Sequence, residues 1–251
     1  MSLIKKIQDF FKGRDDRKIE AALDKIKNPK AIREDRLAAL QFVSSLESWE
    51  QSVPLLLQRF EYSLEHGIND TREKELCLRS IVAYGKICLP AVKRHLMESL
   101  RIAWPIKVIR ELGDDESLAN ILFECLDFTD VSLDQAKVDK NYDILCYLRD
   151  CKLEEDKIER LAHFLEALDE RVRFAATEAL IEQGHAAVAS CLERFLSDDS
   201  PENTRMRQAA LQAFLSQRWK LQDLSKFPNG HVVGPIYVHS DGHLVDAQSS
   251  N

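Results

Sequence analysis

The stretch that decides the fold is DERVRFAATEALIEQG, residues 169–184. It opens with Asp169, whose side chain can cap a helix, and closes on Gly184, a residue type that commonly ends one. Between them, small and apolar residues recur at helical spacing and share one face. These residues are Val172, Ala175, Ala176, Ala179 and Leu180. Because several of them are alanines, the stretch predicts a helix that packs closely against its neighbours.

Weaker copies of this stretch recur along the chain, as LAAL after Arg36 and QAALQAF after Arg207. Gly, Pro and Asn residues that break helices divide the chain into six expected helix pairs. The expected helices span residues 18–27 and 32–46, 50–66 and 71–87, 89–99 and 102–112, 116–128 and 133–151, 154–167 and 170–183, and 186–196 and 202–219. Helix pairs that recur every ~28 to 38 residues are typical of an α-solenoid, because one pair cannot bury both of its faces alone.

Three of the second helices carry an acidic or amide residue followed four positions later by a basic one. These pairs are Asp70 and Lys74, Asp169 and Arg173, and Asn203 and Arg207. We expect the first residue to cap its helix and the second to reach the inter-helix turn of a neighbouring repeat. Asp70 and Glu73 also have the spacing of a capping box. The third and fourth pairs fit poorly, since Trp104 and Tyr142 lie near the small-residue positions, and a bend or twist is expected there.

The segment LEALDERVRFAATEALIEQG resembles a bacterial HEAT repeat of the phycobilisome-lyase type, and RQAALQAFLSQ and DRLAALQFVSSL resemble degenerate copies. The resemblance covers residues 17–219 and is strongest in the fifth pair. It implies an all-α, right-handed α-solenoid of about six HEAT-like helix pairs, with the second helices on the concave face. It also implies that Asp169 and Arg173 bond between repeats, which is a structural role. The resemblance is informative about the fold and nearly silent about function.

Residues 1–14 predict an amphipathic, basic N-terminal helix. Its apolar face consists of Leu3, Ile4, Ile7, Phe10 and Phe11. Its four basic residues and one aspartate give +3, so the rest of the chain carries −7 − 3 = −10. Either this face covers the first repeat, or Lys5, Lys6, Phe10 and Phe11 contact an anionic membrane or a partner.

Residues 15–219 are expected to form the repeat domain, and residues 220–251 a different C-terminal tail. VVGPIYVHSDGHLV predicts short strands joined by a turn at Asp241 and Gly242, that is, a β-hairpin or an irregular tail. A lone hairpin is marginally stable in water, so it must dock on the last repeat, pair with another chain or stay mobile. Docking on the last repeat is the favoured expectation.

Composition restricts the function classes. The chain has 251 residues, a formal net charge of −7 and an expected pI near 5.6. This balance argues against binding along a nucleic-acid backbone, which needs clustered Lys and Arg. The six cysteines form no CxxC pair, which is typical of reduced thiols in a cytoplasmic protein. Neither a secretory signal nor an apolar run of membrane-spanning length is apparent.

No residue pattern predicts a reaction or a cofactor. Walker, Rossmann and nucleophile-elbow motifs are missing, as is the His-Glu dipeptide of di-iron HEAT hydroxylases. His231, His239 and His243 have no acid or cysteine at a recognised metal-binding spacing, so neither a metal nor another cofactor is expected. Cys151 is the best candidate for a reactive thiol, and a buried or incidental role fits it better. A HEAT-like DNA glycosylase, with Trp104 and Asp114 as its nearest approach, is disfavoured by the acidic chain.

The sequence therefore favours a non-enzymatic protein-binding scaffold or adaptor that uses the concave face of the solenoid. The alternatives are a membrane-surface adaptor acting through residues 1–14 and, disfavoured, a HEAT-like lyase, chaperone or DNA glycosylase. The residues predicted to contact a protein partner are Trp104, Arg171, Phe174, Glu178 and Tyr237.

Overall fold

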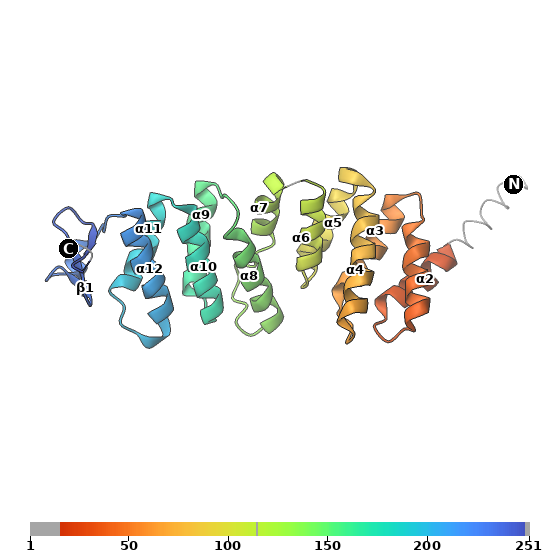
Figure 1. Ribbon diagram of the computed structural model, residues 1–251, viewed down its shortest axis with the longest axis horizontal. Coiled ribbons are helices and arrows are strands. Elements are labelled where there is room, and N and C mark those ends of the chain that lie inside the picture. Colours follow the sequence, from red (N-terminus) through yellow and green to blue (C-terminus); the bar gives the residue numbers. More distant parts are fainter. Residues whose placement is uncertain (1–15, 114, 249–251) are drawn as a thin grey trace, which may run out of the picture. The chain divides into compact units, whose positions relative to one another are not determined.

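The computed structural model describes residues 16–113 and 115–248, and it is mostly helical with a small antiparallel sheet near the C-terminus (Figure 1). This confirms the expected helical class. The chain divides after Ile121 into two compact units, called unit 1 and unit 2. None of the helices in the described ranges has the length and apolar character needed to cross a membrane.

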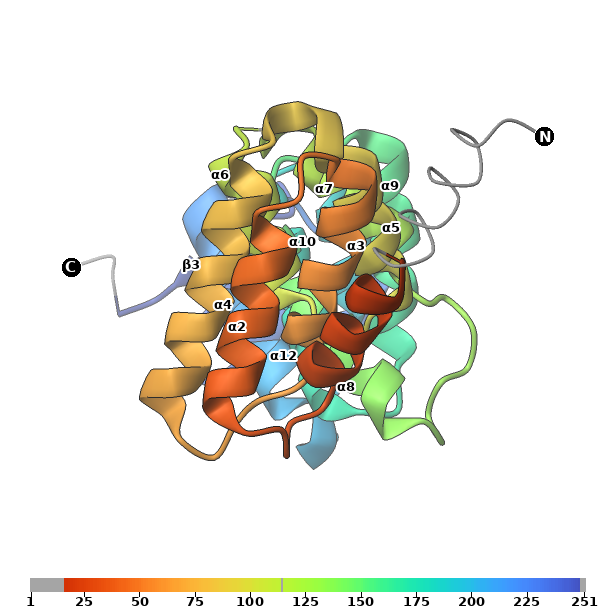
Figure 2. The ribbon, with the colours of Figure 1, turned by 90° about the vertical axis from the view of Figure 1, so that its right-hand side faces the viewer.

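Unit 1 is a two-layered stack of helices. Residues 16–27 are helical and are followed by α2 (Arg33–Ser44), α3 (Trp49–Leu57), η1 (Gln58–Glu61), α4 (Gly67–Val82), η2 (Gly85–Cys88), α5 (Leu89–Glu98), α6 (Ala103–Glu111) and α7 (Asp115–Glu124), which runs across the boundary. In one layer α4 contacts both α2 and α6, and in the other α3 contacts α5. Figure 2 shows α2 and α4 side by side. The apolar faces of the two layers meet in a core that includes Leu40, Leu56 and Ile81.

Unit 2 repeats the same arrangement. It contains α8 (Gln135–Leu148), α9 (Glu155–Leu161), η3 (Ala162–Glu166), α10 (Glu170–Gln183), α11 (Ala186–Leu196), η4 (Pro201–Asn203), α12 (Thr204–Gln217), η5 (Leu224–Lys226), β1 (His231–Val233), β2 (Ile236–Val238) and β3 (Leu244–Asp246). Here α10 lies between α8 and α12, and α9 contacts α11 (Figure 1).

Helix α10 matches the predicted helix residue for residue. Asp169 caps it by accepting hydrogen bonds from the backbone N–H groups of Arg171 and Val172. Gly184 ends it at a φ of 64°, in the left-handed region that favours glycine. The small residues of its apolar face are buried, which allows the close approach to α8 and α12.

Of the three expected basic contacts, those of Arg173 and Arg207 reach the following segment, whereas Lys74 bonds within its own pair, to Asp70 and Ser63 at 2.8 and 3.3 Å. Nη1 of Arg173 donates to the carbonyl oxygens of Ala167 and Leu168 at 2.8 and 3.0 Å, and Nη2 donates to that of Glu202 in the next pair at 3.4 Å. Arg207 donates to the carbonyl oxygen of Val232 at 3.3 Å and forms an ion pair with Asp199. Arg173 therefore satisfies carbonyls of its own turn, and both guanidiniums tie their helices to the next segment, Arg207 through a carbonyl of β1.

Two predicted caps are wrong. Helix α4 begins at Gly67, where the side chain of His66 caps it, and Asp70 lies inside the first turn. Asp70 is drawn instead to the cations of Arg59 and Lys74, at 2.7 and 2.8 Å. Asn203 makes no side-chain cap on α12, and its Nδ2 donates instead to Asp198 at 2.6 Å.

Buried ions join α2, η1 and α4 in unit 1. Glu73, 3% exposed, accepts hydrogen bonds from Nε and Nη2 of Arg36 at 2.8 and 2.9 Å and from Nε of Arg59 at 2.7 Å. Burial alone would raise the pKa of Glu73, but the hydrogen bonds from the two arginines outweigh it and lower that pKa. Together with Asp70, which pairs with Arg59 at 2.7 Å, Glu73 therefore offsets both arginine charges, and its carboxylate is not available for a capping box.

Several helix ends also differ from the predicted ones. The fourth pair is predicted at residues 116–128 and 133–151, but α7 ends at Glu124 and α8 begins only at Gln135. Residues 125–134 form a loop in between, held by side-chain bonds to the backbone that compete with helix formation. The predicted helix at 154–167 is likewise split into α9 and the 3₁₀ turn η3.

The C-terminal tail is a three-stranded antiparallel meander in the order β1-β2-β3, with one more strand than the predicted hairpin. It docks on the last helix pair of unit 2. Strand β3 contacts α12, and Trp219, which directly precedes the tail, is 7% exposed and meets Phe214 of α12 edge to face with ring centres 5.7 Å apart. The carboxylate of Glu193, on α11, accepts from the backbone N–H groups of Gln222 and Asp223 at 2.7 and 2.9 Å. Packing and hydrogen bonds together supply the stability that a free hairpin lacks.

Replacing Glu73 by Gln should lower the free energy of unfolding by about 3–5 kcal/mol, because the buried guanidinium of Arg36 loses its counter-charge and that of Arg59 loses one of its two carboxylate partners. Urea unfolding followed by circular dichroism measures this. The matched control is Asp35→Asn, which breaks the exposed Asp35–Lys25 pair at 2.7 Å and should cost less than about 1 kcal/mol. Equal losses in the two variants would contradict the assigned role of the buried cluster.

The stability difference between the wild type and Glu73→Gln should shrink in acid. Glu73 has a lower pKa in the folded chain than in the unfolded one, so its contribution is present above the unfolded pKa of about 4.3. The contribution is lost as the pH falls through the folded pKa. Unfolding curves of both proteins between pH 7 and pH 3 test this, and a constant difference would show that the Glu73 charge does not stabilise unit 1.

Candidate functional site

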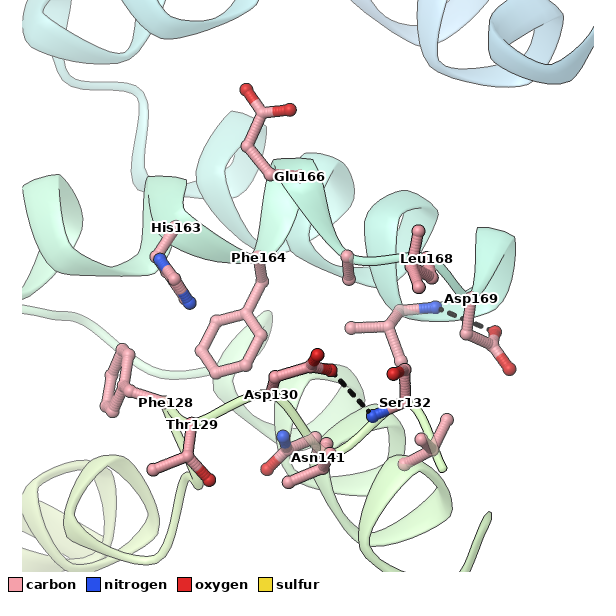
Figure 3. A pocket seen from close by; sticks show the side chains of 14 residues that line it. Phe128, Thr129, Asp130, Ser132, Asn141, His163, Phe164, Glu166, Leu168 and Asp169 are labelled. Carbon is pink, nitrogen blue, oxygen red and sulfur yellow. Dashed lines mark hydrogen bonds between the residues drawn. The ribbon is translucent and has the colours of Figure 1, made fainter. Parts of the chain in front are cut away.

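A pocket of about 400 Å³ lies in unit 2, where the 125–134 loop meets α8, η3 and the start of α10 (Figure 3). Its volume falls within the range of small-ligand and side-chain pockets, ~300–1,000 Å³. The lining residues are Phe128, Thr129, Asp130, Val131, Ser132, Val138, Asn141, His163, Phe164, Glu166, Ala167, Leu168, Asp169 and Val172. The sequence analysis predicted no site here.

Aromatic and aliphatic side chains form the wall of the pocket. The rings of Phe128 and Phe164 lie 5.0 Å apart, and Arg160 stacks over Phe128 at 4.9 Å. Val138 and Val172 are buried beneath, whereas Leu168 at the rim is 77% exposed. An exposed leucine beside an apolar hollow is typical of a contact surface, since burying it against a partner is favourable.

The loop that forms one side of the pocket is fixed by Asn141, a residue of α8 that is 2% exposed. Its Oδ1 accepts from the backbone N–H of Asp127 at 3.0 Å, and its Nδ2 donates to the carbonyl oxygen of Asp127 at 2.9 Å. The carboxylate of Asp127 in turn accepts from Thr129, and that of Asp130 accepts from the N–H of Ser132 at 3.0 Å. These bonds give the pocket a defined shape without a bound partner.

Three carboxylates belong to the lining, and two of them already have cationic partners. Glu166 forms an ion pair with Arg194 and points away from the pocket in Figure 3. Asp169 pairs with Arg171 at 2.9 Å, and the hydrogen bond from this guanidinium lowers the pKa of Asp169. Asp130 lies between Phe164 and Ser132 in the same view and has no cationic partner among the described residues.

A row of paired ions and aromatic rings follows α8, α10 and α12. Nη2 of Arg171 bonds to Asp139 of α8 at 2.9 Å, and the guanidinium lies 5.5 Å from the ring centre of Tyr142. One helix further, Arg205 stacks over the ring of Phe174 at 3.9 Å. Because Arg171 also bonds to Asp169, this row begins at the edge of the pocket.

The structure brings three of the predicted contact residues together. Arg171, Phe174 and Glu178 lie on α10, with Arg171 exposed, Phe174 half-buried and Glu178 paired with Arg149 at 3.7 Å. Tyr237 is elsewhere in unit 2, on β2, where it is 43% exposed and lies 5.2 Å from the ring of His231. Whether a partner contacts these residues stays a prediction.

The remaining predicted contact residues divide into one with a packing role and four outside the described residues. Trp104, in unit 1, stacks on Phe60 with ring centres 5.7 Å apart and lies beneath the ammonium of Lys107. Lys5, Lys6, Phe10 and Phe11 precede the part of the chain that the structure describes.

Aromatic rings, carboxylates and one histidine line the pocket. His163 is exposed, and its ring centre lies 6.1 and 5.7 Å from those of Phe128 and Phe164. Within residues 16–113 and 115–248, no three His, Cys, Asp or Glu side chains are arranged to hold a metal ion. In the tail, His239 and His243 both bond to Asp241, at 2.9 and 3.0 Å.

Sequence reasoning missed the pocket because it treated residues 129–132 only as a short break between two predicted helices and extended helix over Phe128. One signal was available: TDVSLD, residues 129–134, has the Asp and Ser content of a turn but keeps two apolar residues. One of these is Leu133, whose side chain is fully exposed.

Comparison with known proteins adds no assignment: no protein-family model, no curated protein and no solved structure matches the chain.

Replacing Asn141 by Asp should loosen the 127–134 loop. The new oxygen would face the carbonyl oxygen of Asp127, so a hydrogen bond of 2.9 Å becomes a repulsive contact. Hydrogen exchange followed by mass spectrometry should show amide exchange in this loop about tenfold faster or more. Gln212→Glu, the corresponding change at an exposed position of α12, should leave the loop unchanged. Unchanged exchange in Asn141→Asp would contradict the role of Asn141.

Proposed function

We propose that unit 2 is a non-enzymatic protein-interaction module whose pocket receives an apolar side chain of a partner protein. The observation that carries this proposal is the apolar pocket of about 400 Å³ with Leu168 exposed at its rim. A volume of this size accommodates one or two side chains of a linear segment. The fixed loop supports the proposal too, because a preformed pocket loses little conformational entropy on binding.

A binding role fits the lining better than a catalytic one. Catalysis by a nucleophile requires a base within hydrogen-bonding distance, oriented by a third group. In the described part of the pocket, His163 contacts aromatic rings, and the carboxylate of Asp130 accepts from a backbone N–H. These groups are suited to recognition by packing and charge.

The row along α8, α10 and α12 offers a surface over which a bound segment could continue. Arg171 and Phe174 present a guanidinium and a ring, the residue types that contribute most at protein interfaces. Their bonds to neighbouring helices hold them in place before a partner arrives. We therefore place the binding surface on the second helices of unit 2.

We also infer that the helix pairs of both units are HEAT-like repeats stacked as in an α-solenoid. Two features support this inference: second helices contact second helices in succession within each unit, and Arg36 and Arg173 bond to turn carbonyls of their own pairs. The six cysteines all have free thiols, which fits a reducing compartment such as the cytoplasm.

The experiment selects twelve-residue peptides from a phage-displayed random library on the full-length protein and measures their affinities by fluorescence polarisation. Peptides that occupy the pocket should lose at least about tenfold in affinity for Leu168→Glu, because a charge replaces an apolar contact worth ~1.5–3 kcal/mol. Leu168 is 77% exposed, so this variant should fold normally.

The matched control is Leu224→Glu, at a leucine of η5 that is 44% exposed and outside the pocket lining. It should bind the selected peptides like the wild type. The proposal fails if no selected peptide distinguishes Leu168→Glu from the wild type.

A further inference from the structure

If the pocket binds a protein segment, as proposed, the negative charge of Asp130 favours segments with a basic residue over segments with an acidic one. The carboxylate of Asp130 accepts one backbone hydrogen bond, from Ser132 at 3.0 Å, whereas an ionised carboxylate offers about four acceptor positions. Asp130 is ionised at neutral pH as an ordinary aspartate is, and the hydrogen bonds from Ser132 lower its pKa further. A negative charge with free acceptor positions therefore faces the pocket.

The neighbouring charges do not neutralise it. Of the other two carboxylates of the lining, Glu166 is paired with Arg194 and Asp169 with Arg171. Lys137, on the first turn of α8, bonds to Asp127 at 3.2 Å. Among the described residues, the lining thus combines an apolar wall with one carboxylate that lacks a cation.

We infer that the pocket recognises a linear protein segment in which an apolar side chain is accompanied, within about three residues, by a lysine or arginine that pairs with Asp130. The apolar side chain packs against Phe128, Phe164 and Leu168. A volume of 400 Å³ corresponds to a width of about 7 Å, which two to three residues of extended chain span at ~3.3 Å each. An acidic residue at the same position is repelled, so Asp130 selects against it.

This inference rests on the proposed function and makes a separate prediction about charge. On the wild type, selected peptides should carry Lys or Arg within three positions of a Phe, Trp, Leu or Met. Changing that basic residue to Glu in a synthetic peptide should weaken binding about tenfold, because attraction becomes repulsion. The loss should diminish at high salt, since exposed charges are screened.

Asp130→Lys reverses the pocket charge and should reverse the preference. The Glu-containing peptide should then bind more tightly than its Lys-containing parent. Asp130→Asn keeps an acceptor for Ser132 while removing the charge, and it should bind both peptides with similar affinity. The control, Glu159→Lys, makes the same charge change at an exposed position of α9 outside the lining, and it should keep the wild-type preference.

The outcomes separate the two proposals. If Leu168→Glu loses binding but the Lys and Glu peptides bind the wild type equally, the pocket binds peptides and the charge inference is overturned. The charge inference is also overturned if Asp130→Lys weakens both peptides to the same extent. If Leu168→Glu binds all selected peptides normally, the proposed function itself fails.

Discussion

The contact on which unit 2 most depends is the one between Arg173 and the turn that precedes its own helix. This guanidinium satisfies the carbonyl oxygens of Ala167 and Leu168, which lie between η3 and α10 and have no helical partner there. It also reaches the carbonyl oxygen of Glu202 in the next pair. One side chain thereby fixes the shape of a turn and the spacing between two helix pairs.

This contact also fixes the backbone of Leu168, one of the residues that line the pocket. Because the backbone of Leu168 is held by Arg173, its side chain can project outward next to Phe164 while the turn keeps its shape. On the opposite side, Asn141 performs a comparable task by bonding both backbone groups of Asp127. The apolar wall is therefore held between two turns, each anchored by a polar side chain from a second helix.

In unit 1, Arg36 occupies the position that corresponds to Arg173, but it makes different contacts. Arg36 donates to the carbonyl oxygen of Ala31, as Arg173 does to its own turn, but its remaining hydrogen bonds go to Glu73. Glu73 also accepts from Arg59, and Arg59 donates in turn to Asp70. A chain of buried charges must be completed once it has begun, since any member left alone would be strongly destabilising.

These arrangements explain how far the sequence could predict the structure. Local periodicity and capping were sufficient for α10 and α11, whose ends depend on neighbouring residues such as Asp169 and Gly184. Local patterns did not predict the role of Asp70 correctly, because this side chain pairs with Arg59 of η1 and does not cap α4. They failed again in the 125–134 loop, where side-chain bonds stop the helix ten residues before the next one begins.

The candidate site lies where the regular pattern is interrupted, and this follows from the geometry of stacked pairs. Where a turn is short, the apolar faces of adjacent pairs close on each other and leave no hollow for a ligand. The loop of residues 125–134 is long enough to hold Phe128 away from Val138 and Val172, and the space between them becomes the pocket. Helix α10, whose bounds the sequence predicted, thus forms a rigid side of the pocket. The 125–134 loop supplies Asp130, whose charge selects basic over acidic segments.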